Sequence, residues 1–156
     1  MIFIVRHAKA GSRTDSADDS ARCLSRAGAA QSIALREMLI AAGATGPLLS
    51  SPFTRCRQTL EPLADRLGIH IDIDPCLGEA QPIGALLELV RSASEGTVLC
   101  SHGDMIPDLM SALQRRGCCF LSEPNWKKAS TWVLARNADG EVTTARCIAP
   151  PDMLER

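Results

Sequence analysis

Short apolar runs alternate with longer amphipathic segments along most of the chain. A short apolar run bounded by turn residues favours a buried strand, and apolar residues at helical spacing favour a helix. The predicted strands are 2–7, the beginning of 47–68, 69–74, 96–102 and two more within 130–149, on either side of the turn sequence NADG. The predicted helices are 24–44, the remainder of 47–68, 82–93 and 104–117.

Residues at the helix ends support this assignment. Ser25 is a suitable N-cap for the first helix, and Ser51 followed by Pro52 is a suitable start for the second. Gly43 and Gly68 stand where glycines commonly end helices. Within the first helix, apolar residues follow helical spacing at Ile33, Ala34, Met38 and Ala41.

The alternation of strands and helices predicts an α/β fold. We expect a three-layer α/β/α sandwich with a mostly parallel central sheet, because helices that connect parallel strands cover both faces of a sheet. The last two strands predict a C-terminal antiparallel hairpin at the edge of that sheet. No linker interrupts the pattern, so a single domain is predicted over 1–156.

Composition narrows the class of protein. The chain is 46% hydrophobic and 22% charged, which is typical of a soluble globular protein. No apolar run approaches the ~20 residues needed to span a bilayer. The formal net charge of −1 provides no global field for nucleic acid or an anionic membrane, so we expect neither as a partner. The cysteines are odd in number and form no C-x-x-C pair, which favours reduced, mainly packing thiols in the cytoplasm.

Unusual polar residues follow three of the predicted strands. Arg6 and His7 end the first, Ser51 and then Arg55 follow the second, and His102 ends the fourth. In open α/β sheets, ligands bind outside the carboxyl ends of the strands. If these strands are parallel neighbours, the three sets of residues face one crevice.

The residues at this crevice favour an anion. Arg55 falls in the first turn of a helix, where the positive end of the helix dipole disfavours a cation unless an anion is bound there. The alternative is that Arg55 points into solvent. A metal is not expected, because arginines would repel it and neither Cys nor carboxylate stands nearby at ligand spacing. His70 is interpreted as structural, and Asp15, Asp18 and Asp19 as part of a solvated loop.

Four motifs, in order along the chain, carry a family resemblance. They are VRHA at 5–8, LSRAGAAQ at 24–31, SSPFTRCRQT at 50–59 and CSHGDMI at 100–106. Together they resemble the signatures of the histidine phosphatase superfamily, with Ala8 where the family's Arg-His-Gly motif has glycine. The resemblance implies a phosphoglycerate mutase-like fold and a phosphatase that needs no metal and no cofactor.

The resemblance also implies roles for individual residues. His7 would attack phosphorus and form a phosphohistidine, and Arg6, Arg55 and His102 would bind the phosphoryl oxygens. Glu79, within CLGEAQ, would act as the general acid, and a phosphate beside it would favour its protonated form. The alternative for Glu79 is an ordinary surface carboxylate.

The resemblance narrows the substrate less sharply. Mutases of the family carry asparagine where this chain has Arg13, and Lys9 adds further charge, so a compact phosphatase is favoured. The chain is similar to histidine phosphatase domains that follow Nudix domains in MutT-type hydrolases, which implies nucleotide or dinucleotide polyphosphates and a functional link to a Nudix hydrolase. It is also similar to small phosphohistidine phosphatases that act on phosphoproteins.

Two further alternatives stay open at this point. One is a phosphate-sensing module that uses the same pocket without turnover. The other concerns Trp126, Lys127 and Lys128, which either contact a base and an outer phosphate or form a solvated loop.

Overall fold

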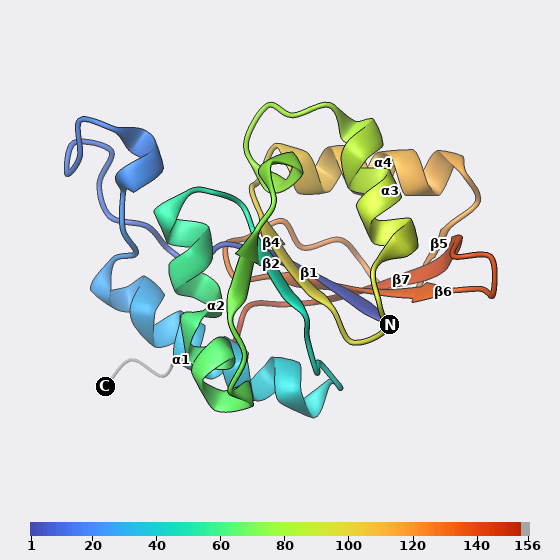
Figure 1. Cartoon of the computed structure of the whole chain (residues 1–156), viewed down its shortest axis with the longest axis horizontal. Coiled ribbons are helices and arrows are strands. Elements are labelled where there is room, and N and C mark those ends of the chain that lie inside the picture. The colour runs from blue at the N-terminus through green and yellow to red at the C-terminus, as the bar shows by residue number, and fades with distance from the viewer. Residues whose placement is uncertain (154–156) are drawn as a thin grey trace.

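The computed structural model describes residues 1–153, and its centre is a seven-stranded sheet with helices on both faces (Figure 1). The strands are β1 Ile2–Arg6, β2 Leu48–Ser50, β3 Ile71–Ile73, β4 Val98–Ser101, β5 Cys119–Phe120, β6 Thr131–Arg136 and β7 Val142–Ile148. They lie in the order β3-β2-β4-β1-β6-β7-β5. The three-layer α/β fold expected from the sequence is confirmed.

The sheet is mostly parallel, as predicted. β1 pairs in parallel with β4, β4 with β2, and β2 with β3. β6 runs antiparallel to both β1 and β7, and the predicted C-terminal hairpin consists of β6 and β7. The hairpin does not form the edge of the sheet, however. The edge is β5, a two-residue strand parallel to β7 that the sequence pattern did not indicate.

Helices α1 Arg26–Ala41 and α2 Thr54–Leu67 cover one face of the sheet, and α3 Ile83–Ser92 and α4 Met105–Arg115 cover the other (Figure 1). Alternate side chains of β1 enter the two cores, because successive residues of a strand point to opposite faces. Phe3 and Val5 pack with α1 and α2, whereas Ile2 and Ile4 pack with α3 and α4. β1 therefore has no solvent-exposed face, and its polar residues are confined to its end.

Two helix starts differ in how well they were predicted. Ser25 caps α1 as expected, because its Oγ accepts a hydrogen bond from the Gly28 amide at 3.0 Å. Ser51 is not the cap of α2; that helix begins at Thr54, and its capping position is Phe53. The Ser51 hydroxyl is used in the site described below. The face of α1 that is buried consists of Gly28, Ser32, Leu35 and Leu39, rather than the apolar residues proposed from spacing.

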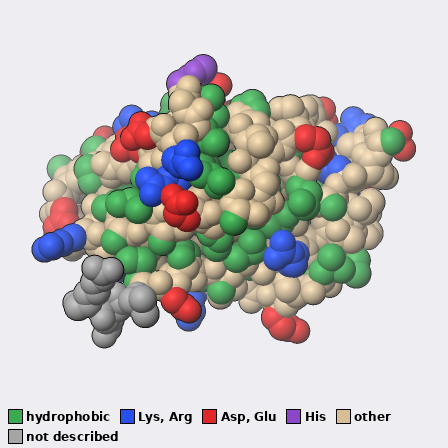
Figure 2. Space-filling view, turned by 90° about the horizontal axis from the view of Figure 1, so that it is seen from below, with side chains coloured by type: hydrophobic (Ala, Val, Ile, Leu, Met, Phe, Trp, Pro, Cys, Tyr) green, Lys and Arg blue, Asp and Glu red, His purple; other side chains and the backbone are tan. Residues whose placement is uncertain are grey.

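The molecular surface in Figure 2 is mixed in character. Acidic, basic and hydrophobic side chains lie interspersed on this face, with Lys and Arg side chains singly or in small groups. This face therefore presents no continuous basic patch. Within residues 1–153, no helix has both the length and the apolar character that a membrane crossing requires.

Candidate active site

The predicted site residues meet at the carboxyl ends of β1, β2 and β4. Strand register brings them together, since Arg6 pairs with Ser101 and Ser50 pairs with Cys100. The ladder extends one residue further on each side of β4. The His7 amide donates to the Ser101 carbonyl at 3.1 Å, and the Ser51 amide donates to the Cys100 carbonyl at 3.1 Å. His7 and Ser51 are thereby fixed by backbone pairing, and His102 directly follows the paired Ser101.

His7 is held in one orientation and one tautomer. Its Nδ1 lies 2.8 Å from the carbonyl oxygen of Ala8, and a carbonyl can only accept, so Nδ1 carries the proton. Nε2 is therefore the nitrogen with a free lone pair. Ala8 is held in turn, because its amide donates to Thr59 Oγ1 at 2.9 Å. This arrangement leaves one defined nucleophilic atom on a ring that is only 5% exposed.

The environment keeps the His7 ring neutral. Burial lowers the pKa of His7 from its ordinary value of 6.5 to about 3, and the neighbouring His102, Arg55 and Arg6 act in the same direction. The two histidine rings lie edge to face, with centroids 5.4 Å apart. Desolvation is the largest of these causes, and repulsion from the neighbouring cations adds to it. A neutral imidazole is the form that can attack phosphorus.

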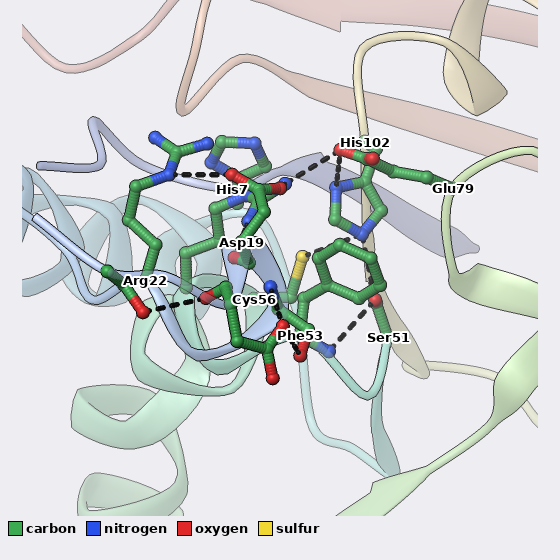
Figure 3. A network of polar contacts seen from close by, with 12 residues as sticks. His7, Asp19, Arg22, Ser51, Phe53, Cys56, Glu79 and His102 are labelled. Atoms are coloured by element: carbon green, nitrogen blue, oxygen red, sulfur yellow. Dashed lines mark hydrogen bonds and ion pairs between the residues drawn. The ribbon is translucent and has the colours of Figure 1, made fainter. Parts of the chain in front are cut away.

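His102 is oriented from behind by Ser51, as Figure 3 shows. The Ser51 hydroxyl accepts from the Phe53 amide at 3.2 Å and lies 2.8 Å from His102 Nε2. The two ring nitrogens of His102 therefore have different neighbours, since Nε2 faces the Ser51 hydroxyl and Nδ1 faces Glu79. Nδ1 lies 3.3 Å from Glu79 Oε1 but has no aligned hydrogen-bond partner among the described residues. His102 therefore presents its Nδ1 edge toward Glu79.

Cys56 also contacts His102, a contact for which no sequence pattern provides a signal. Its Sγ lies 3.6 Å from His102 Nε2 and 3.8 Å from the Ser101 carbonyl, and the residue is fully buried. Burial opposes the thiolate, but hydrogen bonds from Cys100 and His102 lower the pKa of Cys56. The thiol therefore belongs to the polar support behind His102, although a packing role was expected for most cysteines.

Arg55 lies in the first turn of α2 and points into the site, not into solvent. Its side chain is 2% exposed and makes charge-assisted hydrogen bonds to two carboxylates. Nη2 donates to Glu79 Oε1 at 2.7 Å and to Asp19 Oδ2 at 3.2 Å, and Nη1 donates to the Asp19 carbonyl at 2.9 Å. Asp19 also binds Arg22, through Oδ1 at 3.0 Å. Asp19 is thus part of the site, a role that was missed when its loop was interpreted as solvated.

Arg6 is held against a glycine. Its Nη1 donates to the carbonyl of Trp126, and its Nε is buried without a partner among the described residues. A Cβ atom added to Gly103 would lie 2.7 Å from Arg6 Cζ, so the guanidinium occupies the space that a side chain at 103 would need. The CSHGDMI motif therefore supplies His102 and, at Gly103, the space that the Arg6 guanidinium occupies.

These residues line a pocket of about 340 Å³ that is rich in positive charge. The lining residues are Arg6, His7, Arg13, Arg22, Arg55, Glu79, Gly103, Asp104 and Lys128. Of Trp126, Lys127 and Lys128, for which the sequence left two interpretations open, only Lys128 lines the pocket. The Trp126 ring packs against Trp132, with the two ring centroids 5.4 Å apart.

The pocket suits an anion better than a cation. Five cationic side chains face two carboxylates, Glu79 and Asp104, and the Asp104 carboxylate is occupied by the amide of Ala80 at 2.8 Å. Within residues 1–153, no three His, Cys, Asp or Glu side chains are grouped as metal ligands. Arginines and a helix N-terminus are the groups that proteins use for phosphate.

Known proteins resemble this chain in sequence. A curated 8-oxo-(d)GTP phosphatase of Mycolicibacterium smegmatis is 37% identical over 158 residues, which cover 97% of this chain and 48% of the relative. The chain thus spans about half the length of that protein.

Solved structures resemble it in fold. The protein histidine phosphatase SixA, solved with tungstate, has a TM-score of 0.72 at 24% identity and covers 91% of this chain and 92% of its own. A mycobacterial glucosyl-3-phosphoglycerate phosphatase in complex with VO3 has a TM-score of 0.66 at 21% identity and covers 94% and 96%.

The family assignment rests on the region that contains most of the site. The model of the histidine phosphatase superfamily (branch 1) matches residues 2–83, which include Arg6, His7, Arg55 and Glu79. His102 lies beyond the match and is joined to these residues by the register of β1 and β4. The fold of the solved relatives agrees with this assignment. The chain belongs to the histidine phosphatase superfamily.

Proposed function

We propose that the protein is a metal-independent phosphatase that forms a phosphohistidine on His7. The observation that carries this proposal is the state of the His7 ring. It is neutral, its Nδ1 proton is bound by the Ala8 carbonyl, and it lines a pocket of arginines. Such a ring has one free lone pair, on Nε2, beside groups that stabilise the charge of a phosphoryl group in transfer.

In the first step, His7 Nε2 forms a bond to phosphorus as the bond from phosphorus to the leaving oxygen breaks. Arg6, Arg55 and His102 bind the phosphoryl oxygens. Glu79 donates a proton to the leaving oxygen. In the second step Glu79 accepts a proton from water, the water oxygen bonds to phosphorus, and the P–N bond breaks to restore neutral His7.

The present contacts of Glu79 support this proposed exchange. Its Oε1 lies 2.7 Å from Arg55 Nη2 and 3.3 Å from His102 Nδ1, so it occupies donors that a phosphate would use. Its side chain is 42% exposed and therefore has room to withdraw. An incoming phosphate displaces the carboxylate and, by charge repulsion, favours its protonation.

The substrate class that we propose is a nucleotide or dinucleotide polyphosphate. The support is the relative named 8-oxo-(d)GTP phosphatase, whose similarity covers nearly all of this chain. The likeness to SixA concerns the fold, at 24% identity, and does not favour a phosphohistidine protein as substrate. Two alternatives are therefore distinguished by the test below: a phosphohistidine protein as the substrate, and a sensing module without turnover.

The test is to trap the intermediate. The protein is mixed with nucleoside diphosphate labelled at its terminal phosphate, in EDTA, and quenched in alkali. We expect a label on the parent that is stable in base and lost in acid, and no label or turnover on folded His7→Ala. Turnover by His7→Ala would contradict the mechanism. Binding without label or turnover would indicate the sensing module, and a label obtained only from phosphohistidine protein would indicate the other substrate class.

A further inference from the structure

The segment after Trp126 places Lys128 at the edge of the pocket. The Ser130 amide donates to the Lys127 carbonyl at 3.0 Å, which closes a turn with Lys128 and Ala129 at its centre. Ala129 is fully buried and has a φ of 64°, a conformation that is uncommon for a residue other than glycine. Surrounding contacts must therefore hold this turn in place.

Those contacts tie the turn to the nucleophile. The Ala129 amide donates to the carbonyls of Arg6, at 3.1 Å, and His7, at 3.2 Å. The residue before Ala129 is thus fixed beside β1 and extends its side chain into the pocket. Lys127, its neighbour in the turn, is exposed and lies outside the pocket lining.

Lys128 is a cation without a counter-charge. Among residues 1–153, no carboxylate lies within ion-pair distance of its ammonium group. Burial lowers the pKa of Lys128, and so do Arg6, Arg22, Arg55 and Lys9 around it. Placing an ammonium among four other cations is unfavourable unless an anion is bound between them.

The phosphate that His7 attacks does not need this extra charge. Arg6, Arg55 and His102 already surround it, and Arg22 is paired with Asp19. Apart from Arg6, two lining cations have no ion pair in the described part of the chain, Lys128 and Arg13. Both belong to loops at the pocket edge, where the part of a substrate beyond the reacting phosphate would lie.

We propose that Lys128, together with Arg13, binds the phosphate next to the one that His7 attacks. The inference rests on the proposed function and deepens it, because it assigns the substrate as a phosphoanhydride with at least two phosphates. The bond that breaks then joins the terminal phosphorus to the bridging oxygen. The leaving group is the inner phosphate, whose developing negative charge Lys128 stabilises.

The test compares Lys128→Gln with Lys127→Gln, which removes the same charge from the same turn outside the pocket. For a nucleoside diphosphate, kcat/KM should fall about 10- to 100-fold in Lys128→Gln, the range for losing one hydrogen bond to a charged group. Hydrolysis of p-nitrophenyl phosphate should change little, and Lys127→Gln should match the parent on both substrates. An equal loss on both substrates, or no loss on either, would overturn the subsite.

A binding measurement separates this proposal from the proposed function. Methylenediphosphonate cannot be cleaved at its bridge, so its affinity is measured by calorimetry without turnover. The parent should bind it at least about tenfold more tightly than inorganic phosphate, a preference lost in Lys128→Gln and kept in Lys127→Gln. Equal affinity for the two probes in the parent would overturn the subsite even if phosphatase activity is found. The preference without any phosphatase activity would support the subsite and contradict the proposed enzyme.

Discussion

At the scale of single residues, hydrogen bonds orient the two histidines of the site. The Ala8 carbonyl can only accept, so it fixes the proton of His7 on Nδ1. Ser51 orients His102 through a contact of 2.8 Å with its Nε2. The two imidazoles thereby have different surroundings although they lie side by side.

The low pKa of His7 predicts how stability depends on pH. Because the folded state holds His7 with a pKa of about 3, against 6.5 when unfolded, the unfolded state binds more protons between these values. The contribution of His7 to the free energy of unfolding therefore falls as pH is lowered from 6.5 toward 3. Denaturant titrations at pH 7.5 and 4.5 should show a smaller acid-induced loss in His7→Ala than in the parent.

The exposed histidine is the control for this measurement. The His70 side chain is 84% exposed and lies outside the active-site pocket, so His70→Ala controls for the histidine-to-alanine change itself. An acid-induced loss as large in His7→Ala as in the parent would show that the His7 ring is not held neutral. Because the pKa of His7 is this low, its ring should stay neutral well below pH 6.5, and its protonation should not limit p-nitrophenyl phosphate hydrolysis there.

The proposed role of Glu79 predicts a dependence on the leaving group. Glu79→Gln cannot donate a proton, and acid assistance matters most when the departing oxygen is most basic. Its kcat should fall more for an alkyl phosphate than for p-nitrophenyl phosphate. Steady-state rates on both substrates measure the difference. An equal loss on both would mean that Glu79 shapes the pocket, and Asp104 would become the next candidate acid.

The contact between Gly103 and Arg6 predicts a loss of activity without a loss of stability. In Gly103→Ala the new Cβ would displace the Arg6 guanidinium, the far end of a flexible side chain, at little cost in folding. If Arg6 binds phosphate as proposed, its small misplacement should lower kcat/KM by about 10- to 100-fold. Kinetics and thermal unfolding of the same sample test both halves. A large drop in melting temperature, or unchanged kinetics, would contradict this account.

At the scale of elements, α1 is positioned by close contact with the loop after β1. The Lys9 carbonyl accepts from the Ser25 amide at 2.9 Å, and Gly28 packs directly against that carbonyl. The LSRAGAAQ motif thus attaches the start of α1 to the segment that carries His7. The motif was identified as a helix start from the sequence, and its packing role appears only in the structure.

Gly28 and Gly84 form a matched pair of helix substitutions. A Cβ at Gly28 would lie 1.8 Å from the Lys9 carbonyl oxygen, whereas a Cβ at Gly84 meets nothing within 4 Å. Gly28→Ala should lower the free energy of unfolding by more than about 2 kcal/mol, because backbone must move. Gly84→Ala should raise it by up to about 1 kcal/mol. Urea denaturation measures both, and similar effects from the two would refute the packing argument.

Elements were predictable where neighbouring residues decide the structure. The apolar runs of β1 and β4 leave little choice, and Ser25 caps the helix that directly follows it, although its hydroxyl also donates to the Lys9 carbonyl at 3.2 Å. Ser51 has two possible uses, and its partner His102 lies 51 residues away, so local pattern cannot decide between cap and support. β5 has two residues, too few to show a period, and its pairing depends entirely on β7.

At the scale of the whole molecule, the sheet determines half of the pocket and the loops determine the rest. His7, Arg55 and His102 could be placed together from the sequence, because parallel strands end at one edge. Asp19 and Arg22 could not, because tertiary contacts such as the Arg22 hydrogen bond to the Gly11 carbonyl hold their loop in place, and the sequence left Lys128 with two interpretations. Loops carry no periodic pattern from which such contacts can be read.

In the unliganded site, Arg55 is already paired with the carboxylates of Asp19 and Glu79. Phosphate binding therefore replaces one anion by another, like an ion exchange, instead of filling an empty site. We expect a phosphate that replaces Glu79 to favour protonation of the displaced carboxylate, as the proposed role of Glu79 requires. Calorimetry in two buffers of different ionisation enthalpy measures the protons exchanged when phosphate binds. Because phosphate itself exchanges protons near neutral pH, the contribution of Glu79 is the difference between parent and Glu79→Gln, and the parent should take up more protons.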